Sequence, residues 1–298
     1  MTRSPLDPDV LSRIAGLSLR VRRVVEGGLS GAHRSRRHGS SIEFAEHRKY
    51  SWGDDLKHVD WKAYGRTDRY YLKQFEDETR FAAHILLDAS GSMAYRHRQA
   101  PWSKFEAAQC LAGALAWLVV MQGDAVGMWA GGEGDAVPLP AVAGREQLRR
   151  VIEFLEPLQP AGRIEPHWWR GMAERFPQRS LVVAVSDLMD EEGEAISGLQ
   201  RLRHAGHDVI LFHVLDPAEL SFPFARTTRF VALEGAARVV TEPRAVRRAY
   251  LEEIERFLER VESACRGSGI DYQRMVTNES LGKVLAAFLA WRRTRMAW

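Results

Sequence analysis

The segment DASGSM places one carboxylate and two hydroxyl groups at alternate positions, Asp88, Ser90 and Ser92, directly after the apolar run FAAHILL. A turn that follows a strand can bring side chains with this spacing to a single point. Carboxylate and hydroxyl oxygens are hard ligands of the kind that Mg²⁺, Ca²⁺ and Mn²⁺ bind. The spacing therefore predicts a site for Mg²⁺ or another divalent cation. A structural interpretation stays open, because Ser and Asp in such turns often accept hydrogen bonds from free backbone N–H groups.

A second aspartate has the same relation to an apolar run. Asp187 follows LVVAV at 181–185, much as Asp88 follows 81–87. In a parallel sheet with helices on both faces, functional groups collect at the carboxyl ends of the strands. If the two predicted strands are neighbours, the carboxylate of Asp187 reaches the same point as Asp88 and joins the predicted metal ligands.

From residue 80 onward, apolar runs of strand length alternate with helical segments, which is typical of a mainly parallel sheet covered by helices. Strands are predicted at 81–87, 124–130, 181–185, 208–214 and 271–276, with a weaker antiparallel one at 136–139 and a short one at 238–240. Helices are predicted at 102–122, 144–155, 191–204, 243–261 and 281–288. The predicted fold class is therefore α/β, a doubly wound, Rossmann-like sheet with helices on both faces.

Composition places the chain among ordinary globular proteins, with 45% hydrophobic and 27% charged residues. The net charge of +3 gives no global argument for a polyanionic partner. The most apolar window, 107–121, is shorter than the ~20 residues that span a bilayer, so we expect a buried helix. The first twenty residues lack the features of a secretory signal, and two distant cysteines, Cys110 and Cys265, fit a reducing compartment. These observations predict a cytoplasmic protein.

Residues 1–77 form a distinct N-terminal region ahead of a main domain at 78–298, since they are rich in charge, Gly and Ser and poor in long apolar runs. A helix is predicted at 8–25, followed by a loop. The region also holds a Gly-Asp-Asp motif, made of Arg48, Tyr50, Gly53, Asp54, Asp55, Asp60 and Trp61. The simpler interpretation is structural, with a tight turn at the Gly, a helix cap from an Asp and an anchoring Trp. The alternative is a second contact surface for a partner.

Three blocks in the same order make the chain resemble a known family. HRKYSWGDDLKHVDWKAYGRTDRYYLKQFEDE, the DASGSM turn with its second aspartate, and GHDVILFHVLDPAELSFPF are similar to the family of unknown function DUF58 over 31–298. The resemblance implies a von Willebrand factor A-like fold, no established catalytic activity and association with MoxR-type AAA+ ATPases. It also implies a metal-ion-dependent adhesion site whose ligand positions are Asp88, Ser90, Ser92 and Asp187.

One position departs from the pattern of such adhesion sites. Where these domains often carry a Thr in a Gly-rich loop, this chain has Ile164, which has no oxygen to donate. The next residue, Glu165, is the candidate substitute ligand. The departure leaves open whether the site binds a metal strongly or at all.

The sequence favours a non-catalytic binding adaptor over an enzyme. The serines lie in ASGSM rather than in a G-x-S-x-G nucleophile elbow, and the chain has no G-x-x-x-x-G-K-[ST] phosphate loop. The alternative enzyme is a Mg²⁺-dependent phosphoryl-transfer or phosphatase-like protein that uses Asp88 as nucleophile. A third hypothesis is nucleic-acid binding through an arginine cluster, although no aromatic residues lie between the arginines to stack on bases. The cluster consists of Arg20, Arg22, Arg23, Arg34, Arg36 and Arg37.

Overall fold

The computed structural model describes residues 44–49, 65, 71–75, 82–134, 136–177, 179–190 and 193–295, which belong to two compact units. In the smaller unit, β1 (Phe44–Lys49) and β2 (Tyr71–Phe75) pair antiparallel, which the sequence pattern does not predict. Arg48 of the Gly-Asp-Asp motif lies in β1. Outside the described residues lie the predicted helix at 8–25, the arginine cluster, and Tyr50, Gly53, Asp54, Asp55, Asp60 and Trp61.

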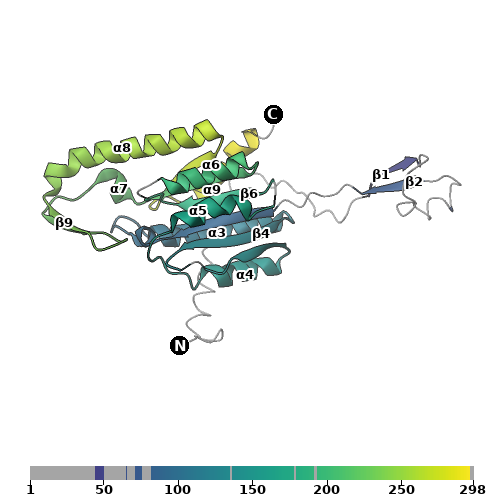
Figure 1. Ribbon diagram of the computed structural model, residues 1–298, viewed down its shortest axis with the longest axis horizontal. Coiled ribbons are helices and arrows are strands. Elements are labelled where there is room, and N and C mark those ends of the chain that lie inside the picture. The colour runs from purple at the N-terminus through teal and green to yellow at the C-terminus, as the bar shows by residue number, and fades with distance from the viewer. Residues whose placement is uncertain are drawn as a thin grey trace. The chain divides into compact units, whose positions relative to one another are not determined.

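The larger unit is built on a six-stranded sheet with the order β10-β7-β6-β3-β4-β5 (Figure 1). Its strands are β3 (Ala82–Ala89), β4 (Ala125–Gly132), β5 (Leu139–Ala143), β6 (Leu181–Ser186), β7 (Asp208–Leu215) and β10 (Asp271–Val276). Every neighbouring pair in this sheet is parallel except β4 and β5. The predicted doubly wound α/β class is confirmed.

The antiparallel strand lies further along the chain than predicted. The sequence pattern places it at 136–139, whereas β5 shares only Leu139 with that range. Pro138 precedes β5, and a proline has no N–H to donate to a strand ladder. β5 pairs with β4 from Leu139 onward, and it accommodates Pro140 because it is an edge strand of the sheet.

Helices cover both faces of the sheet, and each face has its own hydrophobic core. The helices are α3 (Lys104–Met121), α4 (Glu146–Leu155), α5 (Pro166–Gly171), α6 (Glu194–His204), α7 (Pro217–Ser221), α8 (Pro243–Ser268) and α9 (Leu281–Arg295), with short 3₁₀ turns η2 (Gly91–Ala94) and η3 (Met172–Glu174). Residues from α3, α4 and α9 join one core, and residues from α5, α6 and α8 join the other. Side chains alternate along β3, so that Ile85 and Leu87 belong to the first core and Leu86 to the second.

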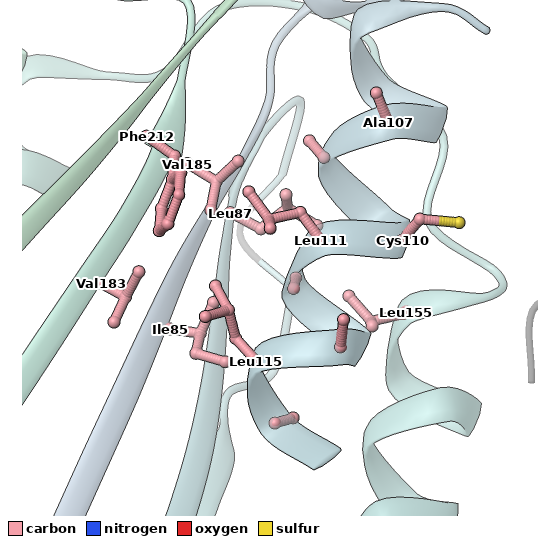
Figure 2. Close-up of a cluster of buried hydrophobic side chains, with 14 of the residues drawn as sticks. Ile85, Leu87, Ala107, Cys110, Leu111, Leu115, Leu155, Val183, Val185 and Phe212 are labelled. Carbon is pink, nitrogen blue, oxygen red and sulfur yellow. The ribbon is translucent and has the colours of Figure 1, made fainter. Parts of the chain in front are cut away.

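The apolar helix α3 packs directly on the sheet. Figure 2 shows Leu111 and Leu115 of α3 facing side chains of β3 and β6. The helix begins at Lys104 rather than at residue 102, because Ser103 is its N-cap and forms a capping box with Glu106. In the described part of the chain α3 alone is long and apolar enough to cross a membrane, and 67% of that window is buried within the unit. This degree of burial is typical of a core helix and agrees with the prediction of a buried helix at 107–121.

A second, two-stranded sheet is formed by β8 (Thr228–Val231) and β9 (Arg238–Thr241). The sequence pattern predicts only the second of these strands, at 238–240. It also does not predict the short helices α5 and α7, each of which begins with a proline. Elements of four to six residues carry too little periodicity to be recognised, yet all of these segments contribute to the site described below.

His84 of β3 is a buried titratable group in the second core. Its ring stacks on Phe176 with the centroids 4.3 Å apart, and neither ring nitrogen has a hydrogen-bond partner among the described residues. Burial, with a smaller effect from His207, lowers the pKa of His84 from 6.5 to about 4. Between these two values the unfolded chain binds a proton that the folded chain does not. Stability that is present above pH 6.5 is therefore lost as the pH falls toward 4.

We expect this histidine to contribute roughly 2 to 3 kcal/mol to the loss of unfolding free energy between pH 6.5 and pH 4. That part of the loss should be absent from His84→Phe, since no proton can bind there. Urea unfolding of both proteins across this pH range measures the difference. Identical pH dependences in the two proteins would show that His84 is not buried in its neutral form.

Candidate functional site

Asp88 and Asp187 lie at the point where the strand order of the sheet reverses. β3 and β6 are parallel neighbours, with Leu87 paired to Val185. From β3 the chain continues through α3 to β4 on one side, whereas from β6 it continues through α6 to β7 on the other. Crevices at such switch points, beyond the carboxyl ends of the strands, are where open α/β sheets bind ligands. The expectation that the two strands are neighbours is confirmed.

All of the sequence-predicted site residues in this unit line one cavity of about 900 Å³: Asp88, Ser90, Ser92, Glu165 and Asp187. The hydroxyl oxygens of the two serines are 3.1 Å apart. Glu165 lies at the start of α5 and is exposed, while the preceding Ile164 packs on the second core. The structure therefore brings the carboxylates and hydroxyls together, with Glu165 at the solvent-facing part of the cavity wall.

Asp88 is buried without a cationic partner. Its carboxylate oxygen Oδ1 accepts a hydrogen bond from the N–H of Ser90 at 2.9 Å, and Oδ2 accepts one from the hydroxyl of Ser186 at 2.5 Å. The described residues place no Lys, Arg or His side chain in an ion pair with it. Burial and the negative charge of Asp187 raise the pKa of Asp88 to about 7, against the opposing effect of these hydrogen bonds. A cation beside this carboxylate would favour its ionised form.

Asp187, by contrast, is paired with a lysine that sequence reasoning missed. The Nζ atom of Lys104 lies 2.7 Å from Asp187 Oδ2 and 2.6 Å from Glu219 Oε1, and the lysine side chain is 1% exposed. Burial alone would lower the pKa of Lys104, but the two carboxylates outweigh it and raise the pKa above its ordinary value. The main chain also holds Asp187, since the N–H of Met189 donates to its Oδ1 at 3.1 Å.

Two signals in the sequence point to this ion pair. Lys104 is the one basic residue of α3 and lies in its first turn, where the helix dipole disfavours positive charge. A lysine there needs an acidic partner. Glu219 lies in the motif DPAE, where it forms a capping box with Asp216 at the start of α7. Neither signal says that the two residues meet, because they are 115 positions apart in the sequence.

The residues around Asp88 fit a divalent cation. Asp88, Asp187 and Glu219 bring three negative charges when ionised, against one positive charge on Lys104, so the crevice keeps a net negative charge. The hydroxyls of Ser90 and Ser92 and the carboxylate of Asp88 are hard oxygen donors within one cavity. Among the described residues no three His, Cys, Asp or Glu side chains form a metal site by themselves. The donor set that fits a cation here therefore combines the Asp88 carboxylate with the two serine hydroxyls.

A comparison with family models identifies this chain as a member of the DUF58 family, described as "Protein of unknown function DUF58", with residues 46–259 matched. The predicted family is therefore confirmed. Among curated proteins, the uncharacterized protein Rv1480 of Mycobacterium tuberculosis is 26% identical over 223 residues, which cover 73% of this chain and 68% of that protein.

Solved structures with a similar fold include the conserved hypothetical protein BatB from Bacteroides thetaiotaomicron, at 20% identity and a TM-score of 0.47, with 72% of this chain and 99% of that chain covered. The VWA domain of SpRpn10 matches at 11% identity and a TM-score of 0.37, with 70% and 94% covered. The likeness concerns the fold alone, and the α/β class rests on the strand order described above.

Replacing the buried lysine tests the ion pair in the crevice. In Lys104→Met the carboxylates of Asp187 and Glu219 lose their shared ammonium, so we expect the free energy of unfolding at pH 7 to fall by about 3 to 5 kcal/mol. The matched control is Lys283→Met, which changes an exposed lysine of α9. Urea denaturation compares the two variants with the unchanged protein. A loss no larger than that of the control would mean that the lysine does not pair in the interior.

Proposed function

We propose that this chain is a non-catalytic protein-binding adaptor whose cation site recruits a partner through a carboxylate. The observation that supports this most is the convergence of Asp88, Ser90, Ser92 and Asp187 on one cavity at the switch point of the sheet. Mg²⁺ or another divalent cation held there by two neutral hydroxyls and a carboxylate would retain positive charge. Such an ion attracts an acidic side chain from outside.

The shape and lining of the cavity support a protein ligand. Besides the charged groups, its lining includes aromatic side chains such as Phe224, Phe230 and Tyr250. A partner segment that inserts an acidic residue can therefore also bury apolar surface against these walls, and apolar burial contributes roughly 25 cal/mol per Å². The pairing of one charged contact with apolar walls is typical of specific binding pockets.

The partner class rests on family resemblance. We propose a MoxR-type AAA+ ATPase, the partner that the resemblance to the DUF58 family implies. A cytoplasmic location for the complex stays a prediction.

The environment of Asp88 favours binding over the phosphoryl-transfer alternative. A nucleophilic carboxylate needs an oxygen that can reach the phosphorus atom. Asp88 is 4% exposed, and both of its oxygens accept hydrogen bonds from the chain itself. This arrangement suits a residue that supports a cation better than one that attacks a substrate.

Calorimetric titration with Mg²⁺ and Mn²⁺ tests the cation site. We expect the protein to bind at least one of these ions, and Asp88→Asn to bind it about 10- to 100-fold more weakly, because the variant keeps the side-chain shape but loses the charge. Glu255→Gln, a change at an exposed position of α8, is the control and should bind as the unchanged protein does. Absence of binding to the unchanged protein would remove the cation from the proposed function.

A pull-down with the purified MoxR-type ATPase of the same bacterium tests the adaptor role. The proposal predicts capture in Mg²⁺, loss of capture in EDTA, and weak capture by Asp88→Asn. Failure to capture the ATPase under either condition contradicts the partner assignment. Turnover of a panel of phosphoesters that disappears in Asp88→Asn would instead support the enzyme.

A further inference from the structure

The turn of the β8–β9 hairpin, residues 232–237, lies against the loop that carries the serine hydroxyls. Within this turn every residue is exposed except Glu234, whose side chain is 15% exposed. The hairpin also contacts the end of α7, whose Glu219 reaches the same crevice, because Phe230 of β8 stacks on Phe222. The hairpin thus sends one acidic side chain inward while the rest of its turn faces solvent.

Glu234 is held at the serine loop by specific contacts. Its Oε1 accepts a hydrogen bond from the N–H of Ser92 at 2.9 Å. Arg163 donates to the main-chain oxygen of Glu234 at 3.1 Å, and the Nε of the arginine lies 3.8 Å from Oε2. One carboxylate oxygen is therefore fixed next to Ser92, and the other has a long contact with a half-exposed guanidinium among the described residues.

Gly91 permits this close approach. A Cβ at position 91 would lie 2.5 Å from the main-chain oxygen of Leu233 and 3.2 Å from Cγ of Glu234. The first contact is too short for any side chain, and its partner is backbone that cannot rotate away. The glycine between the two serines therefore lets the hairpin turn pack on the loop.

We infer that Glu234 is a ligand group of the cation site, supplied by the chain itself at the place where the partner's carboxylate would bind. This inference rests on the proposed function. It also offers a second candidate, besides Glu165, for the residue that replaces the missing threonine oxygen. Glu165 is exposed on the cavity wall, whereas Glu234 is hydrogen-bonded to Ser92, one of the predicted ligands. The carboxylate of Glu234 must then leave the cation before a carboxylate from a partner can bind in its place.

Three variants separate Glu234 from the alternatives. Mn²⁺ is titrated by calorimetry into the unchanged protein, Glu234→Ala, Glu234→Gln and Glu165→Ala, which tests the competing candidate. Glu255→Gln, at an exposed position of α8, is the control. We expect both changes at 234 to weaken Mn²⁺ binding about 10- to 100-fold, and the control to leave it unchanged. Glu234→Gln keeps an oxygen that accepts from Ser92, so its loss of affinity reports the charge rather than the hairpin packing. Added acetate should restore much of the affinity of Glu234→Ala, since it supplies the missing carboxylate.

Hydrogen exchange provides a readout besides affinity. Mn²⁺ should slow exchange of the backbone amides of 228–241 and Ser92 in the unchanged protein, and should have no such effect in Glu234→Ala. Unchanged Mn²⁺ affinity in both variants at 234 would overturn this inference while leaving the cation site intact. An equal loss in Glu165→Ala, or absence of Mn²⁺ protection at the hairpin, would also overturn it. If the unchanged protein binds neither Mn²⁺ nor Mg²⁺, the cation of the proposed function fails as well.

Discussion

Two carboxylates, Asp88 and Asp187, are buried at the ends of adjacent strands, and the need to stabilise both of them away from water is the constraint around which this end of the molecule is organised. Moving an ionised carboxylate out of water is costly unless a cation or several hydrogen-bond donors replace the lost hydration. The two carboxylates have different kinds of interaction partner. Within the described part of the chain, Asp187 pairs with the ammonium of Lys104, while Asp88 accepts hydrogen bonds from Ser90 and Ser186. The imbalance leaves Asp88 as the carboxylate that a bound cation would stabilise.

Several elements serve mainly to hold these charges. The cap at Ser103 begins α3 at the position that directs Lys104 into the crevice, and α7 begins with a capping box that contains Glu219. The β8–β9 hairpin also contacts the site, because Glu234 in its turn accepts a hydrogen bond from Ser92 in the serine loop. Short elements with weak sequence signals thus carry much of the electrostatic arrangement, whereas the long strands and α3 provide the rigid frame.

The sequence predicts the frame well because buried strands such as 181–185 and an apolar helix at 107–121 are uniform in hydrophobicity and long enough to be recognised. It also predicts that Asp88 and Asp187 meet, since parallel strands place their ends at one edge. The sequence does not predict which residues pair with the groups of this site. Lys104 pairs with groups 83 and 115 positions away, and Ser92 pairs with a residue 142 positions away. No local pattern encodes such pairings, so Glu165, the nearest acidic residue to Ile164, is preferred from sequence over the more distant Glu234.

The account as a whole depends on a cation lying where the hydroxyls and the uncompensated carboxylate converge. A cation there would balance the charge that Lys104 leaves uncompensated and give an acidic partner something to bind. The most direct measurement is anomalous diffraction from crystals of the protein soaked in Mn²⁺. The account predicts one strong anomalous peak within coordination distance of Ser90, Ser92 and Asp88, with Glu234 adjacent. A crevice without a peak, or Mn²⁺ bound only elsewhere, would contradict it.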